Sequence, residues 1–571
     1  MLRSFALAVA LVCSLAAEAA PKAVIEINPE NWYVRKGAMG ALKGLSLTRG
    51  YAPFPVFFEG WKSEPQGDAT VYEWDFGDES KKAQGFCGAH VYEKPGKYTV
   101  TLKVTDGAGA SATEKVEIEV LQPDGKTYYV DFEKGDDAND GQSPEKPWKN
   151  VGKALGGMCE ATYGPGDRIL LKRGQTFPLN AGRLKPGHGK YRFGYSFATY
   201  GEGERPIIKH TAGTEGPLLE FSAPEAAHIG FVDLVFDGTG SDGRRDTIFA
   251  CRAGAANLLF LRCGFRGGHQ HLGFNGPSEP EKKPLNGAFV IGCDGKDSRD
   301  ISIYCKGKRL AIMDNTWEDS GDHIVYGSWF QGGIFSGNKF LRPSFGKTCV
   351  RISGGSLSFE RPTQYVMVRD NVFEGWIDPN KGRNGTNGQR WNYTLCTVSP
   401  NRPGNELIQH IRWENNTVKG FETALQMGAC EDLIVRNNTF EAQGGNAASP
   451  RFKFGSEYEE TPIRGVRFVN NTVISDETRT GVKGTGSIFA LMDYRGQGRH
   501  EGIVIKNNKI AFRNGVATVY WFQSKNPEKR AQAAISDNIY EGFNPAVDKV
   551  VKLSGDYQTA GHEITINELT P

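Results

Sequence analysis

Four side chains that could supply acid, base or cationic chemistry lie close together near the middle of the chain. His323 and Tyr326 belong to the segment DHIVYGS, and Lys347 and Arg351 belong to the segment KTCVRIS. When the two segments are aligned at their final serines, Tyr326 and Arg351 take equivalent positions. Elimination next to a carboxylate needs a cation to neutralise that carboxylate and groups that move a proton. We expect Arg351 to neutralise, Lys347 to be its support or the base, and Tyr326 or His323 to exchange protons.

The same short strand pattern recurs further along the chain. Its apolar–polar alternation predicts that Val325, Val350, Cys396, Leu425 and Phe452 point inward. The outward column would contain Tyr326, Arg351, Thr397, Gln426 and Lys453, one per strand at a spacing of ~4.8 Å. A shift of one residue would turn every one of these side chains around.

Basic and aromatic residues before and after this column predict a substrate-binding surface. Arg252, His269 and His271 precede it, the insertion 376–392 adds Trp376, Arg390 and Trp391, and Lys453 continues the column; the insertion 277–286 would form a second wall. Cations would bind carboxylates, and indole rings would stack on sugar faces. We therefore expect an acidic polysaccharide as the partner.

An internal repeat in the second half of the chain predicts how these residues are held. The repeat is an apolar strand followed by Asn, one further residue and an apolar residue, with Asn at 315, 338, 371, 416, 438, 471, 508 and 538. Its shortest intervals, 22 and 23 residues, fit one coil of a parallel β-helix, and Arg262-Cys-Gly-Phe265 is an imperfect earlier copy. We expect the Asn side chains to tolerate the left-handed backbone of a corner and to form a hydrogen-bonded ladder. About ten coils over 126–560 would span ~50 Å.

Residues 22–121 read as a separate β-sandwich. In YTVTLKVTD, residues 98–106, Val100, Leu102 and Val104 alternate with polar residues, and Pro-Gly and Asp-Gly pairs mark the turns on either side. The motifs WDFGD, residues 74–78, and HVYEKPGKY, residues 90–98, closely resemble the PKD family of immunoglobulin-like modules. The resemblance implies a seven-stranded sandwich that is usually an accessory or spacer module. The short polar linker 121–125 leads us to expect that it folds on its own.

The start of the second part also carries a resemblance. The segments YYVD at 128–131, GDDANDG at 135–141 and GDRILLKRG at 166–174 resemble the first segment of secreted right-handed parallel β-helix proteins of the pectate-lyase-like superfamily. That resemblance implies a short helix, within 151–158, that plugs the end of the coil. The acidic loop at 136–140 lacks EF-hand spacing, and the calcium–carboxylate motifs of pectate lyases are not found. Calcium remains a conceivable cofactor without a motif, and no metal ligands are predicted. The fold class is therefore all-β, a PKD sandwich followed by a right-handed parallel β-helix with an Asn ladder.

Charge and the first residues restrict partners and location. The balance of 68 basic against 66 acidic residues gives no support to nucleic-acid binding. Residues 1–20 combine a basic start, a short apolar stretch and an Ala-x-Ala site, which predicts a signal peptide and a secreted or periplasmic monomer. No later apolar run is long enough for a membrane span.

Several activities fit this pattern. The favoured one is a lyase that cleaves a uronate-containing polysaccharide by β-elimination. A uronate epimerase would share the first proton abstraction, and a glycoside hydrolase would need two carboxylates, for which Asp314, Asp319 and Asp322 are candidates. A non-catalytic carbohydrate-binding or adhesive surface is the remaining alternative.

Overall fold

The structure is a computed structural model of the chain. It describes residues 20–27, 45–67, 69–155, 163–180, 182–184, 193–211, 216–221, 227–240, 247–251, 256–275, 285–344, 347–354, 362–376, 396–398, 408–421, 423–428, 430–441, 451–454, 463–476, 487–493, 501–514, 518–524, 533–543 and 549–555. Of the predicted signal peptide only Ala20 is among them.

Seven strands form an N-terminal sandwich, as expected. They are β1 (Arg49–Tyr51), β2 (Phe54–Glu59), β3 (Val71–Asp75), β4 (Ala83–Gln84), β5 (Cys87–Tyr92), β6 (Gly96–Thr105) and β7 (Ser111–Leu121). One sheet has the order β1-β7-β6-β3-β4, and β2 pairs with β5 opposite it. Val100, Leu102 and Val104 on β6 are completely buried around Trp74, which confirms the predicted alternation.

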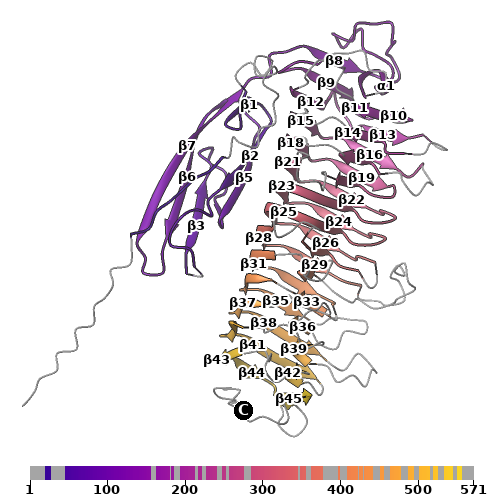
Figure 1. The fold of residues 1–571 in the computed structure, drawn as a ribbon. Helices are drawn as coiled ribbons and strands as arrows, with labels where there is room; N and C mark the ends of the chain where they lie inside the picture. Colours follow the sequence, from indigo (N-terminus) through magenta and orange to yellow (C-terminus); the bar gives the residue numbers. More distant parts are fainter. Residues whose placement is uncertain are drawn as a thin grey trace, which may run out of the picture.

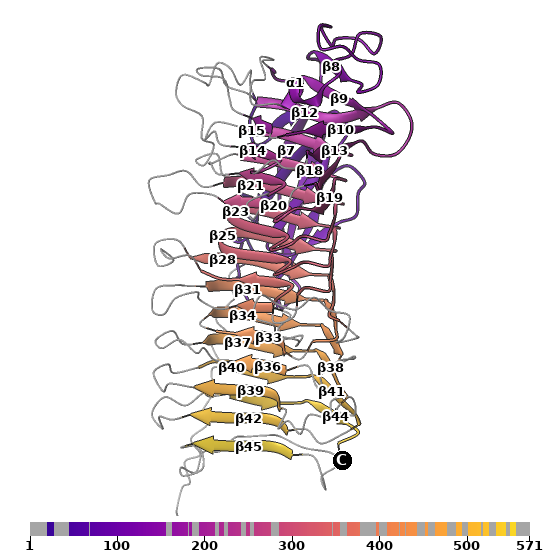
Figure 2. The same cartoon turned by 90° about the vertical axis from the view of Figure 1, so that its right-hand side faces the viewer.

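The following residues form a right-handed parallel β-helix whose coils each contribute strands to three faces (Figures 1 and 2). Face A contains β11 (Gly182–Leu184), β14 (Leu219–Phe221), β17 (Phe249–Cys251), β20 (Leu272–Asn275), β27 (Val350–Ile352), β30 (Cys396–Val398), β33 (Thr423–Met427), β36 (Arg451–Phe454), β39 (Ser487–Asp493), β42 (Thr518–Ser524) and β45 (Lys549–Gly555). Two long strands, β23 (Ile303–Met313) and β25 (Val325–Ser336), begin in face A and continue into face B, which joins these faces into one sheet.

Face B follows face A in each coil, and face C follows face B. Face B contains β8 (Thr127–Val130), β9 (Arg168–Lys172), β12 (Phe193–Tyr200), β15 (Ala227–Val232), β18 (Ala256–Leu261), β21 (Leu285–Ile291), β28 (Thr363–Arg369), β31 (Ile408–Glu414), β34 (Glu431–Arg436), β37 (Arg464–Val469), β40 (Ile503–Lys506) and β43 (Ala533–Ser536). Face C contains β10 (Thr176–Leu179), β13 (Ile207–His210), β16 (Val235–Gly238), β19 (Gly264–Gly267), β22 (Asp294–Lys296), β24 (Thr316–Glu318), β26 (Lys339–Leu341), β29 (Val372–Glu374), β32 (Thr417–Lys419), β35 (Thr439–Glu441), β38 (Thr472–Asp476), β41 (Lys509–Asn514) and β44 (Ile539–Glu541).

The number of coils exceeds the expected ten. Face C is a 13-stranded sheet in the described part of the chain, with one strand per coil. The difference arises in the coils before Asn315, because their corners lack the Asn of the repeat; Cys263, in the imperfect copy, and Cys293 occupy that position in two of them. The Cys263 amide donates to Cys293 Sγ, and the Cys293 amide donates to Asn315 Oδ1.

The predicted Asn ladder runs along the corner between faces B and C. Each ladder side chain donates from Nδ2 to Oδ1 of the Asn one coil later, at 2.9–3.1 Å from Asn315 to Asn538. The same Oδ1 atom also accepts the backbone amide of the preceding ladder residue. All members are buried, so the ladder satisfies polar groups that would otherwise be buried without partners.

The predicted backbone conformation at this corner was wrong by one residue. The left-handed position is taken by the residue before each ladder Asn, such as Asp314 at φ 56°, Asp370 at φ 56° and Asn415 at φ 56°. The physical reason is that two successive residues have different roles. The left-handed residue makes the turn and stays near the surface. The next residue can then point its amide inward into the ladder.

The first coil is closed by a short helix, as the resemblance implies. Helix α1 (Val151–Leu155) places Val151, Ala154 and Leu155 in the hydrophobic core of the β-helix. The acidic loop nearby forms turns, because Asp136 and Asp140 each accept the amide two residues ahead and Asp137 accepts the amides of Lys149 and Asn150. Within the described residues, no cluster of His, Cys, Asp or Glu could hold a metal ion.

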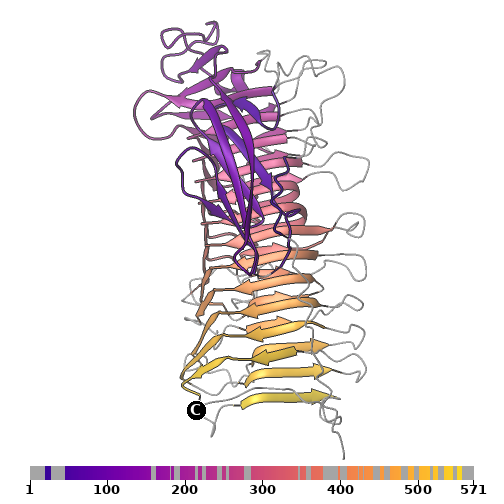
Figure 3. The ribbon, with the colours of Figure 1, turned by 90° about the vertical axis from the view of Figure 1, so that its left-hand side faces the viewer.

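The N-terminal sandwich packs on the outside of face B (Figures 1 and 3). One hydrophobic cluster combines sandwich residues such as Phe54 and Phe57 with outward-facing residues of face B: Val232, Leu259, Leu261, Phe289, Ala311, Ile334 and Met367. Inside this contact Arg309 Nε lies 2.5 Å from Glu59 Oε1, and both side chains are nearly inaccessible. The sandwich therefore covers the upper part of face B and leaves face A on another side of the molecule.

Candidate functional site

The outward column of face A has the predicted register. Tyr326 pairs with Arg351, Arg351 with Thr397, Thr397 with Gln426, and Gln426 with Lys453 on successive coils. The inward neighbours Val325, Val350, Leu425 and Phe452 are completely buried. The side chains of Thr397 and Lys453 lie outside the described residues, so their part in the column rests on backbone register alone.

An aromatic–cation stack occupies the first coils of this column. The rings of Tyr304 and Tyr326 are parallel within 9°, with centres 5.5 Å apart. The Arg351 guanidinium lies 4.9 Å from the centre of the Tyr326 ring, on the next coil. Tyr304 is held by a 3.0 Å hydrogen bond between its hydroxyl and Ser328 Oγ. The stack therefore places the Arg351 guanidinium over the Tyr326 ring on the half-buried outer face.

A buried polar network lies beside the stack, at the corner between faces C and A. Lys347 Nζ is 2.9 Å from Asp322 Oδ2, and His323 Nε2 is 3.3 Å from Asp322 Oδ1. His323 Nδ1 accepts the Thr348 amide at 2.9 Å, which places the proton of a neutral ring on Nε2, facing Asp322. Burial lowers the pKa of His323 to about 4, so the ring is neutral near pH 7.

The His323 ring connects this network to the stack. Its centre is 5.3 Å from the centre of the Tyr326 ring, and only 7% of the residue is exposed. Both ring nitrogens are engaged, one by the Thr348 amide and one by the Asp322 carboxylate. His323 is therefore suited to hold Tyr326 and Asp322 in place, more than to reach a substrate itself.

Sequence reasoning missed Asp300, which belongs to the same corner. The amide of Asp300 donates to the carbonyl of His269, and the amide of Asp322 donates to the carbonyl of Asp300, so the three residues stack on successive coils. Asp300 Oδ2 is 3.3 Å from His269 Nδ1. The signal was present, since Asp300 precedes Asp322 by one coil length of 22 residues. Two carboxylates on adjacent coils therefore border the stack.

The other carboxylates considered from the sequence have structural roles. Asp319 Oδ1 accepts from Arg342 Nε at 2.8 Å, away from the stack. Asp314 makes the left-handed turn before ladder residue Asn315. Neither residue faces the stack of Tyr326 and Arg351.

Apart from His271 and Lys453, the predicted substrate-binding residues divide into three groups. His269 lies in the corner row described above. Trp376 donates from Nε1 to the Pro343 carbonyl at 2.8 Å and has the Arg342 guanidinium 5.8 Å from its ring, just after β29. Arg252, Arg390 and Trp391 lie outside the described residues, as do most of the two insertions.

The position of His271 differs from the prediction. The residue is completely inaccessible, and its ring packs against the stacked rings of Phe265 and Trp317, whose centres are 6.1 and 5.4 Å away. Burial lowers the pKa of His271 to about 3, so it is a neutral core residue. It stands immediately before β20, where the chain turns the corner, and strand alternation does not predict side-chain direction at a corner.

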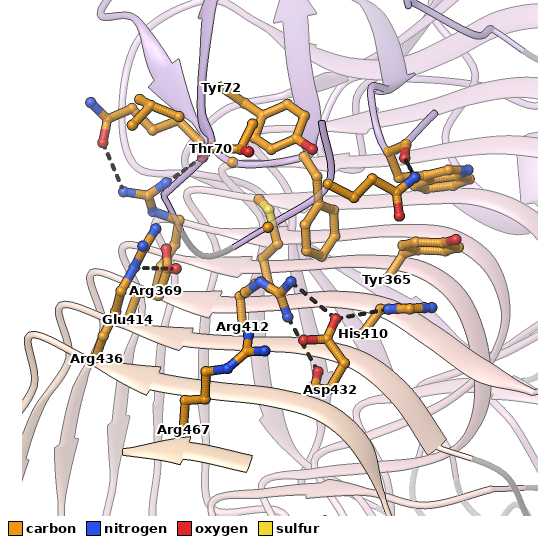
Figure 4. A pocket seen from close by; sticks show the side chains of 18 of the residues that line it. Thr70, Tyr72, Tyr365, Arg369, His410, Arg412, Glu414, Asp432, Arg436 and Arg467 are labelled. Carbon is orange, nitrogen blue, oxygen red and sulfur yellow. Dashed lines mark hydrogen bonds and ion pairs between the residues drawn. The ribbon is translucent and has the colours of Figure 1, made fainter. Parts of the chain in front are cut away.

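A second site, absent from the sequence predictions, lies between the sandwich and face B (Figure 4). The cleft has a volume of about 410 Å³. Its floor comes from face B and includes Arg369, Arg412, Arg436, Arg467, His410, Glu414 and Asp432, and its roof comes from the sandwich and includes Trp61, Gln66, Thr70, Tyr72 and Phe86. These residues come from segments hundreds of positions apart, so no local sequence pattern predicts that they form one site.

Side chains in the cleft hold one another in place. Asp432 Oδ2 is 2.8 Å from His410 Nδ1 and 3.0 Å from Arg412 Nη2. Burial alone would raise the pKa of Asp432, but the hydrogen bonds from His410 and Arg412 outweigh it and lower that pKa to about 2. Tyr365 stacks between Trp61 and His410, with centres 4.4 and 4.9 Å apart, and so ties the sandwich to face B.

Comparison with known proteins identifies one segment. Residues 53–120 match the family described as PKD domain. This segment is a PKD domain. The match covers β2 to β6 and β7 up to Val120, and it extends neither to β1 nor to the β-helix.

Curated relatives share only a small part of the chain. A lacto-N-biosidase of Bifidobacterium longum is 34% identical over 112 residues, which cover 19% of this chain and 7% of the relative. Collagenase ColA of Clostridium perfringens is 41% identical over 68 residues, which cover 12% of this chain and 6% of the relative. The two names denote different activities, and the chain spans less than a tenth of either protein, so these relatives assign no activity to it.

Solved structures with some similarity cover more of the chain. A family 28 exopolygalacturonase of Yersinia enterocolitica is 10% identical, with 89% of this chain and 98% of that chain covered and a TM-score of 0.40. The A-module of a mannuronan C-5 epimerase of Azotobacter vinelandii is 13% identical, with coverages of 68% and 89% and a TM-score of 0.39. A lacto-N-biosidase of Eubacterium ramulus is 12% identical, with coverages of 75% and 67% and a TM-score of 0.30. Similarity at this level assigns no reaction to the chain. In the described residues no helix has the length and apolar character needed to cross a membrane.

Proposed function

We propose that this protein is an exported enzyme that cleaves a uronate-containing polysaccharide by β-elimination on face A. The observation that carries the proposal is the Arg351 guanidinium 4.9 Å from the Tyr326 ring, next to the buried network of Asp322, His323 and Lys347. The basic and apolar start of the chain and the PKD domain support export. Export in turn fits a polymeric substrate, because such a substrate is met outside the cell.

The reaction assigns a separate task to each side chain. Arg351 pairs with the uronate carboxylate and stabilises the charge that develops when the C5 proton leaves. Acting as a phenolate, Tyr326 takes that proton on its oxygen and becomes the neutral phenol, the C5–H electrons form the C4–C5 double bond, and the C4–O bond breaks. The leaving glycosidic oxygen then receives a proton, for which Lys347 or Tyr326 itself is in position. His323, neutral, hydrogen-bonded at Nδ1 to Thr348 and with Nε2 3.3 Å from Asp322 Oδ1, orients Asp322 and the Tyr326 ring.

Glycoside hydrolysis is the second candidate, favoured by one observation. Asp300 and Asp322 lie on adjacent coils, about 4.8 Å apart along the axis at the backbone. Hydrolysis by two carboxylates uses separations of about 5 to 9.5 Å. Both carboxylates are bound by cations or imidazoles, Asp322 by Lys347 and Asp300 by His269, which favours a supporting role for them over the roles of acid and nucleophile.

One assay separates the candidates. The mature protein is incubated with alginate, pectate, glycosaminoglycans and neutral glycans, and ultraviolet absorbance and reducing ends are followed separately. A rise in both supports the lyase, and a rise in reducing ends alone contradicts it in favour of the hydrolase. In D₂O, deuterium uptake at C5 without new ends identifies an epimerase. Binding without any of these signals contradicts the proposal and leaves a binding protein.

A further inference from the structure

The cleft between the PKD domain and face B has the size and the mixture of surfaces of a small-ligand site. Its 410 Å³ falls within the range of about 300–1,000 Å³ that such sites have. One side is aromatic, with Phe86 and the stacked Tyr365, and the other is formed by arginine side chains of face B. A sugar fits such a site, because its ring has an apolar face and a polar rim.

The charge of the lining specifies the ligand further. Four arginines line the cleft with two carboxylates, Glu414 and Asp432, and Asp370 pairs with the lining Arg369 at 2.8 Å, which leaves an excess of one positive charge before His410 is counted. Asp432 is shared by Arg412 and His410, and Glu414 is paired with Arg436 at 2.8 Å. The carboxylates are thus fewer than the cations with which they pair. The net positive charge of the lining therefore favours an anionic ligand.

The register of face B arranges two of these arginines in one row. Arg412 pairs with Ile434, and Ile434 pairs with Arg467, so their backbones are two coils, or about 10 Å, apart. Figure 4 shows both side chains beneath the PKD domain, with Tyr72 above them. Arg412 is fixed in advance by Asp432, by the carbonyls of Ile411 and Asp432, and by the Phe86 ring 5.7 Å away. Such preorganisation lowers the entropy lost on binding.

We propose that this cleft binds a carboxylate-bearing sugar, with its carboxylate held by Arg412 and Arg467 and its ring placed against Tyr365 and Phe86. A bound sugar would contact both parts of the molecule at once. The PKD domain would then be half of a binding site, which is more than the spacer role that its sequence suggested. This site is separate from face A, so it is independent of the proposed lyase reaction.

The test uses the full-length protein with Arg351→Ala, so that face A contributes little binding. Digalacturonate and dimannuronate are titrated by calorimetry, with the neutral disaccharide digalactose as the comparison. We expect saturable binding of at least one uronate, weakening as salt is raised, and no binding of digalactose. Adding Arg467→Ala should weaken that binding by at least about tenfold.

The matched control is Arg464→Ala in the same background. Arg464 lies on the same strand, β37, is 52% exposed, pairs with Glu431 and Glu501, and does not line the cleft. We expect unchanged affinity for this variant and partial recovery for Arg467→Lys, which keeps the charge. The proposal is overturned if neither uronate binds, if digalactose binds equally, or if Arg467→Ala and Arg464→Ala behave alike in proteins with unchanged circular dichroism.

Discussion

The guanidinium of Arg351 lies over the ring of Tyr326, 4.9 Å from its centre, with the two residues directly paired on neighbouring coils. The pairing fixes both groups through the backbone, since each sits on a strand of the same sheet. In the proposed reaction, a substrate carboxylate bound by Arg351 would therefore lie beside the Tyr326 ring. The first two predictions separate the contributions of these two groups.

Arg351→Ala should abolish elimination while the fold is retained. Losing the cation leaves the charge of the intermediate unstabilised, an effect of about 3 kcal/mol or more, equivalent to at least about a hundredfold in kcat/KM. Arg351→Lys should recover part of the rate, because an ammonium carries the charge without the planar fork. Ultraviolet absorbance measures the rate, and Arg464→Ala is the control. Wild-type rates for Arg351→Ala would show that the active site lies elsewhere.

Tyr326→Phe should lower kcat by about 10² to 10⁴ and leave KM nearly unchanged. The substitution keeps the ring between Tyr304 and Arg351 and removes only the hydroxyl. Tyr304→Phe is the matched control, because that hydroxyl is bonded to Ser328 and lies one coil further from the cation. If Tyr304→Phe lost more activity than Tyr326→Phe, the assignment of the proton-transfer group would be wrong.

Acid should destabilise the fold between about pH 6.5 and pH 4, in part through His323. An unfolded His binds a proton below about pH 6.5, whereas the folded pKa of His323 is about 4, so the unfolded state gains protons first as pH falls. The contribution of this single residue reaches on the order of 3 kcal/mol. His228 and His271, whose pKa values burial lowers to about 3, act in the same direction.

The measurement is the free energy of unfolding as a function of pH, for the wild type and His323→Gln. The variant should show a shallower dependence between pH 6.5 and 4, whatever its stability at pH 7. Equal slopes for wild type and His323→Gln would contradict the assignment of a buried, neutral ring.

Asn416→Ala should cost about 2–4 kcal/mol of unfolding free energy. The Asn416 Oδ1 atom accepts both the amide and Nδ2 of Asn371, and its own Nδ2 donates to the Val368 carbonyl. The buried Asn371 amide would lose this acceptor, and Asn371 Nδ2 would keep only its bond to the Phe335 carbonyl. The neighbouring Asn415→Gly is the control and should be nearly neutral or stabilising, since glycine accepts φ 56° without strain. Denaturant unfolding measures both, and equal losses would show that the ladder contributes no special stability.

Breaking the ion pair between the PKD domain and face B should loosen their contact. Arg309→Ala leaves the buried Glu59 carboxylate unpaired and should cost about 3–5 kcal/mol, whereas the double variant with Glu59→Ala should cost much less. Proteolysis of the linker at 121–125 would report the loss. Residues 22–121 expressed alone are still predicted to unfold cooperatively, and a broad, non-cooperative transition would show that the module depends on this contact.

The parts of the fold that repeat along one strand or one corner could be predicted from the sequence. Strand alternation gave the outward position of Tyr326 and Arg351, and the recurring Asn gave the ladder. Side-chain directions at the corners of the coils were harder to predict, because they depend on single left-handed residues such as Asp314. For the same reason His271 was assigned to the surface and Asp300 was overlooked.

The sequence also contains a sign of the contact with the PKD domain. This sign is an uninterrupted apolar segment, and not an alternation of apolar and polar residues. The face B segments at 258–261 (LLFL) and 287–291 (GAFVI) are apolar without interruption, which is typical of strands buried on both sides. Later strands of the same face, such as 408–414 (IQHIRWE), alternate again where the PKD domain no longer covers them fully. The cleft itself required the folded structure, since its walls come from residues 61–86 and 365–467.

The ladder has a consequence for how such a molecule could diversify. Intervals between successive ladder residues range from 22 to 45, yet the bonds that join them stay within 2.9–3.1 Å. Additional residues are therefore inserted at the other corners without disturbing this one. In each coil the ladder corner stays constant, whereas the loops at the other corners vary in length. Loops that contact a ligand could therefore be exchanged one coil at a time while the coils stay aligned.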